Sequence, residues 1–365
     1  MEPVYLDHNA TTPMRGAAIA AVAAASAQCG NASSIHAWGR RARATIEDAR
    51  EAVAALVGAK PEWVVFTGSG TEANNLAIRG ANAAAVAASA IEHPSVLTAR
   101  DGIQEIPVDG DGVLRLDSIP DAGLVSVMLA NNETGVVQPV ARVAEIAKSQ
   151  GALVHCDAVQ AAGRMTIDMR ALGIDLMSLS AHKIGGPQGV GALVVRGGVR
   201  LDAVQRGGGQ ERGLRAGTEN VAGIAGFGAA AVEALSDLPK MQSLARMRDK
   251  LESEIRGVAP EVRIFGAYAG RLANTSCIAM RAVSAESQLM VFDLAGVMVS
   301  SGSACSSGKV ARSHVLAAME IPEDVAETAI RISLGWTTIE ADIDRFVTVW
   351  RTLYRRTHDA VRKVA

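Results

Sequence analysis

The stretch Val64-Val65-Phe66-Thr67-Gly68-Ser69-Gly70-Thr71-Glu72-Ala73 decides the fold class. The run from Val64 to Thr67 is apolar or β-branched, which favours a buried strand, and the glycines behind it allow a close turn into a helix. Short apolar runs and helical stretches keep alternating from here to about residue 200. This alternation predicts a mostly parallel sheet that is covered by helices on both faces.

The same pattern sets the expected elements of the first part of the chain. Strands are expected at residues 63–67, 85–91, 124–130, 152–156, 176–180 and 191–195. Helices are expected at residues 41–58, 71–79, 140–150, 219–235 and 240–256. In the first of these helices, apolar residues recur at three- and four-residue spacing from Ala42 to Leu56, and Gly58 is placed to end it.

A second α/β domain is expected after about residue 257. Strand-like runs at 262–265, 274–279 and 297–300 are separated by helices, and residues 339–362 have a helical pattern. The N-terminal strand is expected to join this part. We therefore predict a large domain at residues 15–256 and a small domain that combines residues 1–14 with 257–365.

Composition excludes several classes of protein. The 365 residues contain 36 Lys and Arg against 38 Asp and Glu, and this net charge of −2 argues against a nucleic-acid arm or a polybasic membrane patch. No run of about 18 apolar residues and no secretory signal is found, so we expect a cytoplasmic protein without a membrane span. The four cysteines form no CxxC pair, so no metal site is predicted.

The glycine turn has three possible interpretations. Gly68 to Ala73 matches G-x-G-x-x-A, and Glu92 lies about twenty residues further on, as in a dinucleotide-binding dehydrogenase. More narrowly, the amides at the start of the helix, with Gly70 and the Thr71 hydroxyl, would bind a phosphate. The turn could also serve no ligand at all.

Three polar residues follow three of the expected strands. Lys183 comes after the run at 176–180, where burial would lower the pKa of its amine and favour a Schiff base, although most lysines are simply solvated. Asp157 ends another run and could either cap a helix or face the crevice at the carboxyl edge of the sheet. His93 could be a structural histidine, or it could lie against a flat ring and move protons.

Together these motifs give the chain a clear resemblance to a known family. The sequence resembles the cysteine desulfurases, in the class-V aminotransferase branch of the fold-type I pyridoxal phosphate enzymes. The segments that carry the resemblance are residues 5–13, 66–74, 92–94, 131–135, 157–160, 180–183, 208–220, 300–308 and 331–335. The resemblance implies a seven-stranded type of sheet in the large domain and a smaller α/β domain, and it displaces the dehydrogenase interpretation.

The resemblance also implies a role for each matching residue. Lys183 would hold pyridoxal phosphate covalently, Asp157 would meet its ring nitrogen, Gln160 its ring hydroxyl, and His93 would stack on the ring. The phosphate would be held by Gly70, Thr71, Ser180 and His182, with Thr218 reaching in from the other subunit of a homodimer. Asn132 and Arg331 would hold the carboxylate of L-cysteine, a task that suits the planar fork of arginine.

Cys305 is the expected nucleophile. It lies in residues 300–308, which contain only Ser, Gly, Ala and Cys and have little to bury. Cys29, Cys156 and Cys277 are expected to be small core hydrophobes instead. By the resemblance, Cys305 would take sulfur from L-cysteine as a persulfide, release L-alanine and pass the sulfur to an acceptor protein, such as an iron–sulfur scaffold or a thiolation enzyme.

Two other functions remain open at this point. One is a selenocysteine lyase or another C–S β-lyase on the same scaffold. The other is a sulfur-relay binding subunit with weak catalysis, for which the only sign is departure from the family pattern. Gly186, Gln188 and Arg312 stand at positions where the family commonly has other residues, and Cys156 replaces a more usual Thr or Val.

Overall fold

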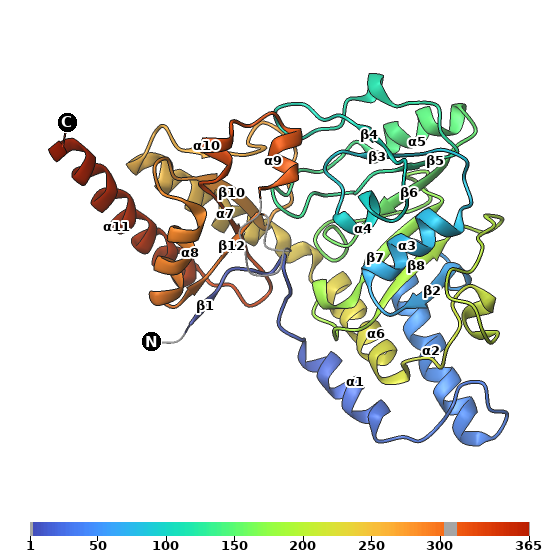
Figure 1. The fold of residues 1–365 in the computed structure, drawn as a ribbon. Coiled ribbons are helices and arrows are strands. Elements are labelled where there is room, and N and C mark those ends of the chain that lie inside the picture. The colour runs from blue at the N-terminus through green and yellow to red at the C-terminus, as the bar shows by residue number, and fades with distance from the viewer. Residues whose placement is uncertain (1–2, 303–311, 365) are drawn as a thin grey trace.

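The computed structural model describes residues 3–302 and 312–364. Figure 1 shows a larger lobe around one sheet and a smaller lobe that carries the C-terminal helices. The large sheet has seven strands in the order β2-β8-β7-β6-β5-β3-β4. Their bounds are β2 (Val64–Thr67), β3 (Val86–Ser89), β4 (Gln104–Ile106), β5 (Leu124–Ser126), β6 (Leu153–Asp157), β7 (Leu176–Ser180) and β8 (Gly191–Val195).

Only β8 runs against its neighbours in this sheet. It pairs antiparallel with both β2 and β7, whereas the pairs from β7 through β6, β5 and β3 to β4 are parallel. The predicted mostly parallel sheet is therefore confirmed. The parallel strands β6 and β7 end side by side, at Asp157 and Ser180, so polar residues that follow them meet at one edge.

Helices cover this sheet as the sequence pattern predicts. They are α1 (Gly16–Ser26), α2 (Ala37–Leu56), α3 (Gly70–Gly80), α4 (Pro94–Leu97), α5 (Val140–Ser149) and α6 (Val221–Ser236). Ile46 and Val53 of α2 are fully buried in the main core with Phe227 of α6, and each such side chain contributes about 1.5–3 kcal/mol. The two helices cross closely, because a Cβ on Gly228 would lie 2.6 Å from the Cα of Ala49.

The smaller lobe is built on a four-stranded antiparallel sheet in the order β12-β13-β10-β9. Its strands are β9 (Arg263–Ile264), β10 (Thr275–Ala279), β12 (Ser300–Ser301) and β13 (Ala329–Ser333). The helices are α7 (Met241–Val258), α8 (Ala285–Leu294), α9 (His314–Ala318), α10 (Glu323–Ala326) and α11 (Glu340–Val364). β1 (Val4–Tyr5) pairs in parallel with β11 (Val297–Met298), so the N-terminal strand joins this lobe as predicted.

A separate hydrophobic core holds the smaller lobe together. Trp350, Phe346 and Phe292 are fully buried in it, and the rings of Phe292 and Phe346 stack with centroids 4.8 Å apart. Leu251 and Ile255 of α7 belong to this core too. The predicted division at residue 256 stays a prediction, but packing places α7 with the C-terminal elements.

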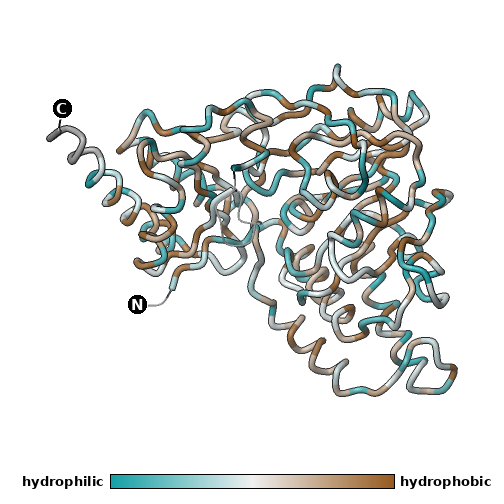
Figure 2. Tube along the Cα trace, in the orientation of Figure 1, coloured by the Kyte–Doolittle hydropathy of each residue, from teal (hydrophilic) through white to brown (hydrophobic). Residues whose placement is uncertain are grey.

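Helix α1 differs from the other helices because it is apolar on all sides. Figure 2 shows hydrophobic residues along it, Ala18 is its only buried residue, and Ile19 is 53% exposed. Within residues 3–302 and 312–364, no single helix is long and apolar enough to cross a bilayer. α6 and the following segment Leu238–Val258 reach that length and composition only as a pair bent by 51°.

Candidate active site

A cavity of about 330 Å³ lies at the carboxyl ends of the parallel strands, between the two lobes. Ten of the sequence-predicted site residues line it: Gly70, Thr71, His93, Asn132, Asp157, Gln160, Ser180, His182, Lys183 and Arg331. Thr218 is exposed and does not line this cavity. Cys305 falls outside the described residues, and Gly302 is the nearest lining residue before it.

Asp157 is held by neighbours on two sides. Its Oδ2 accepts a hydrogen bond of 2.7 Å from Nδ2 of Asn74, and its Oδ1 accepts one of 2.9 Å from the backbone amide of Val159. These two hydrogen bonds fix the orientation of the carboxylate at the cavity wall. Asn74 was not predicted from the sequence, although it stands at the end of the quoted segment 66–74, on the buried face of α3.

His93 is oriented by hydrogen bonds with Ser95, two residues further along the chain. Its Nδ1 accepts from the backbone amide of Ser95 at 3.1 Å and contacts the Ser95 hydroxyl at 2.7 Å. An Nδ1 that accepts an amide proton leaves the proton of the neutral ring on Nε2. Burial lowers the pKa of His93, helped by Lys183 and His314 and opposed by Asp157, so the ring is neutral near pH 7.

Lys183 ends a short 3-10 turn, Ala181–Lys183, directly after β7. Its Nζ donates to the backbone carbonyls of Asn9 at 2.5 Å and Ala10 at 2.9 Å. The N-terminal segment thus supplies part of the cavity wall, through backbone oxygens that have no sequence signature. Burial, together with the nearby Lys183 and Arg164, lowers the pKa of His182 to about 4.

The start of α3 forms one end of the cavity. Ser69 caps the helix by accepting from the Glu72 amide at 3.0 Å, and the following turn places Gly70 and Thr71 on the cavity wall. A Cβ on Gly70 would lie 3.0 Å from Val159 and 3.2 Å from Ser180, so a side chain would crowd both. A helix N-terminus beside the Ser180 hydroxyl suits an anionic group.

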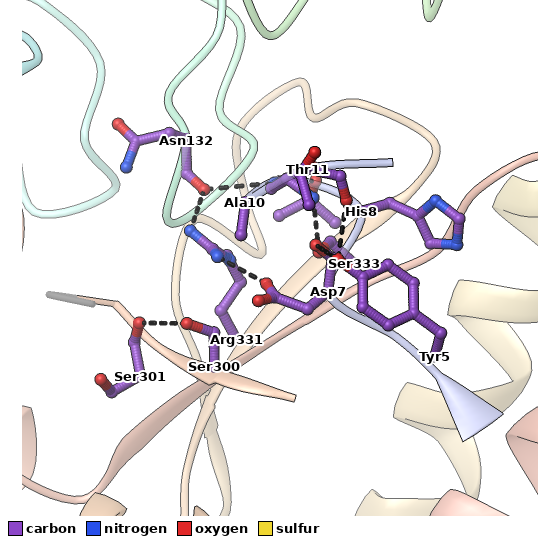
Figure 3. A network of polar contacts seen from close by, with 12 residues as sticks. Tyr5, Asp7, His8, Ala10, Thr11, Asn132, Ser300, Ser301, Arg331 and Ser333 are labelled. Carbon is purple, nitrogen blue, oxygen red and sulfur yellow. Dashed lines mark hydrogen bonds and ion pairs between the residues drawn. The ribbon is translucent and has the colours of Figure 1, made fainter. Parts of the chain in front are cut away.

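The opposite end of the cavity joins the two lobes. In Figure 3, Arg331 lies between Asn132 and Asp7: Nη1 donates to the Asn132 carbonyl at 3.1 Å and Nη2 to Asp7 Oδ1 at 2.7 Å. Arg331 Nε and Asn132 Oδ1 are buried and have no hydrogen-bond partner among the described residues. Buried polar atoms are normally paired, so these two point to a polar ligand in the cavity.

One buried carboxylate, that of Glu133, contacts the residues on both sides of the segment that contains Cys305. Glu133 Oε2 accepts a 2.6 Å hydrogen bond from the Ser313 hydroxyl, and a Cβ on Gly302 would clash with the same oxygen. Burial raises the pKa of Glu133, against the lowering effects of Ser313, His314 and Arg331. Glu133 was not singled out from the sequence, because its role depends on contacts far apart in the chain.

Of the three other cysteines, two are buried as the sequence predicts and one is not. Cys156 and Cys277 are buried as expected, and burial raises the pKa of both thiols, which leaves them poor nucleophiles. Cys29 was expected in a core, but it is exposed. It lies between α1 and α2, where the chain turns at the surface instead of packing against the sheet.

The dinucleotide interpretation of Glu92 fails in the structure. Its side chain is fully buried, its Oε1 accepts from the Met128 amide at 2.5 Å, and it does not line the cavity. Burial and the nearby Asp157 raise the pKa of Glu92 well above its usual value. An enclosed carboxyl group that does not line the cavity cannot bind a ribose there.

Comparisons with known proteins agree with this geometry. Residues 4–346 match the class-V aminotransferase family. A cysteine desulfurase of Cereibacter sphaeroides is 45% identical over 96% of this chain and 95% of its own length, and the cysteine desulfurase IscS of Dictyoglomus turgidum is 40% identical over 93% and 92%. A NifS-like protein from Rickettsia africae superposes with a TM-score of 0.89 at 34% identity, over 97% of this chain and 99% of that one.

Proposed function

The chain belongs to the class-V aminotransferase family, and from this membership we propose a cysteine desulfurase that uses pyridoxal phosphate to take sulfur from L-cysteine. The observation that carries the proposal is the placement of Asp157 and Lys183 at neighbouring strand ends, facing the same cavity as Arg331. Relatives named cysteine desulfurases at 40% and 45% identity support the same function.

The residues around the cavity fit the proposed cofactor. The start of α3, with Ser180 and His182, offers donors for a phosphate, and the held carboxylate of Asp157 suits a protonated ring nitrogen. The neutral ring of His93 suits stacking on a flat aromatic group. Bound there, pyridoxal phosphate would supply an electron sink for the carbanion that forms when the substrate loses its α-proton.

The residues of this chain then have separable tasks. Lys183 would hold the cofactor covalently through its Nζ, and the same amine is placed to move the α-proton of the substrate. Asn9 and Ala10 orient that Nζ through their carbonyls. Arg331 and Asn132 orient the substrate carboxylate as donors, Arg331 through its guanidinium, whose buried Nε has no partner among the described residues, and Asn132 through its Nδ2 amide group.

Cys305 is proposed as the sulfur acceptor. Its thiolate attacks the sulfur of L-cysteine as the bond from sulfur to the β-carbon breaks; the electron pair and a proton go to carbon. The products are L-alanine and a Cys305 persulfide. The persulfide then passes its outer sulfur to an acceptor protein, such as an iron–sulfur scaffold or a thiolation enzyme. We place this reaction in the cytoplasm, where thiols stay reduced.

The proposed enzyme is a homodimer with shared sites. Thr218 is exposed and away from the cavity of its own chain, and α1 presents an exposed apolar surface that another subunit would cover. Mixing inactive Lys183→Ala chains with impaired Thr218→Val chains should restore partial activity, since one site of each mixed dimer then has both residues intact. Verified mixed dimers without recovery would contradict the sharing of sites.

The test of the function is an alanine-release assay with mass spectrometry. Wild-type enzyme given L-cysteine without reductant should release L-alanine and gain one sulfur atom on the peptide that contains Cys305. Cys305→Ala should release almost no alanine while keeping the cofactor, and Cys29→Ala is the matched control with an exposed thiol. Near-normal alanine release by Cys305→Ala would favour direct elimination, as in a C–S lyase.

A further inference from the structure

Arg164 is a charged residue beside the site to which the proposed function gives no task. It lies four residues after Gln160, in the turns that follow β6, and its side chain is partly buried between the N-terminal segment and the turn that contains Lys183. Nη1 donates to the Gln160 carbonyl at 2.9 Å and to Gln160 Oε1, and Nη2 donates to the carbonyls of His8 at 3.0 Å and Lys183 at 3.5 Å.

None of the carboxylates in the described part of the chain balances this charge. Among the described residues, none forms an ion pair with Arg164, and all of its hydrogen bonds go to neutral oxygens. Its titratable or charged neighbours are His8, His182, Lys183 and Arg331. Burial, with help from Arg331, lowers the pKa of Arg164 to about 9. A cation in such surroundings is costly, so its contacts need a reason beyond stability.

The contacts of Arg164 fix the orientation of the Gln160 amide. A guanidinium has only donors, so the group that faces it must be the amide oxygen. On the other side, Gln160 Nε2 donates to the Asn9 carbonyl at 3.0 Å, which can only accept. The oxygen and the NH2 group of the Gln160 amide are therefore assigned. The NH2 group lies on the side of Asn9, which also lines the cavity, and its second hydrogen remains to donate to a ligand in the cavity.

We propose that Arg164 is a positioning residue that locks the Gln160 amide with its NH2 group toward the cavity, as a donor to the ring oxygen of the bound cofactor. This inference rests on the proposed function, because it names the ligand that accepts the hydrogen bond. The positive charge of Arg164, which contacts Gln160 and the carbonyl of Lys183, would also favour the anionic form of an oxygen bound to Gln160. Both effects act through Gln160 or through space, not by contact with substrate.

The visible absorbance of the bound cofactor tests this assignment without measuring activity. That band depends on a proton shared between the Lys183 nitrogen and the ring oxygen. Without a fixed donor and a nearby cation, the oxygen is more basic and keeps the proton to higher pH. Arg164→Met should therefore raise the pH midpoint of the band by about one unit and weaken pyridoxal phosphate binding to the apoenzyme about tenfold.

Three further variants separate positioning from general loss of structure. Arg164→Lys, which keeps the charge and one donor, should recover most of the shift, and Arg164→Gln offers a second neutral side chain if the Met variant does not fold. Arg142→Met is the matched control, because Arg142 is exposed and pairs with Glu145 at 2.8 Å, away from the cavity. It should leave the midpoint unchanged.

A double-mutant cycle decides whether Arg164 acts through Gln160. In a Gln160→Leu background, Arg164→Met should cause a clearly smaller shift than it causes alone, because only the through-space effect of the charge remains. An equal shift in both backgrounds, or no shift in folded Arg164→Met and Arg164→Gln, would overturn the proposal. Failure of the proposed function would look different, since wild-type protein would then show no visible band with pyridoxal phosphate.

Discussion

The two ends of the cavity differ in how completely their polar groups are paired. At the ring end, the two side chains that would meet the cofactor ring are paired, Asp157 with Asn74 and Val159 and His93 with Ser95, and the unpaired buried atom there, Oδ1 of Asn74, belongs to a supporting residue. At the carboxylate end, Arg331 and Asn132 each keep one buried polar atom that has no partner in the described chain. Paired groups are rigid before any ligand arrives, whereas unpaired ones are satisfied only when a ligand binds.

This difference matches the lifetimes of the two proposed ligands. A cofactor that stays bound needs a preorganised site, and its partners come from the strand ends and helix starts of one sheet. A substrate that enters and leaves in every cycle needs a site that is less tightly closed. That site lies between the lobes, where Arg331 of β13 meets Asn132 and the N-terminal segment (Figure 3).

The ring end should show the largest effect on catalysis. Asp157→Asn keeps the shape and the contact with Asn74 but removes the charge that would keep the cofactor's ring nitrogen protonated. We expect kcat to fall about 10³-fold with little change in melting temperature. Steady-state kinetics measure this, with Asp168→Asn as a control on an exposed carboxylate. A loss under tenfold would mean that Asp157 does not serve the ring.

The carboxylate end should show a smaller effect that falls mainly on KM. Arg331→Ala removes the donor to the substrate, and we expect kcat/KM for L-cysteine to fall about 100-fold while cofactor absorbance is unchanged. The exposed Arg312, which pairs with Glu323 at 3.7 Å, provides the control variant Arg312→Ala. Loss of the cofactor from Arg331→Ala would show that the two ends are not separate.

The sequence predicted the residues at strand ends better than the contacts that join distant segments. Buried strands are continuous apolar runs, so their ends, and with them Asp157, Ser180 and Lys183, could be located from the pattern alone. β4 was missed because Gln104 and Glu105 are exposed and the strand has only three residues. Asn74 and the carbonyls of Asn9 and Ala10 were missed because their contacts join segments far apart, or use backbone atoms that every residue has.

The smallest predicted effect concerns stability and comes from a buried histidine on β6, two residues before Asp157. His155 lies between the hydroxyls of Ser126 at 2.8 Å and Ser178 at 2.9 Å, and burial lowers its pKa to about 4. The unfolded chain takes up a proton near its ordinary pKa of 6.5, whereas the folded histidine does not until about 4. The free energy of unfolding should therefore fall by a few kcal/mol as the pH drops through this range.

Urea unfolding at pH 7.5 and pH 5 would measure this loss. His155→Gln, which can still bond both hydroxyls, should reduce the pH dependence of the unfolding free energy. His8, with a pKa lowered to about 3 by burial and by Arg164, contributes in the same direction and will leave part of the dependence in place. An unchanged dependence in His155→Gln would mean that His155 is not the group that titrates.

Reductive trapping tests the central claim most directly. Borohydride treatment of the protein with pyridoxal phosphate, followed by peptide mass spectrometry, reports which lysine holds the cofactor. The account predicts the added mass on the peptide that contains Lys183, and its loss in Lys183→Ala. Attachment to another lysine, or no attachment at all in folded wild-type protein, would contradict the assignment of this cavity as the catalytic site.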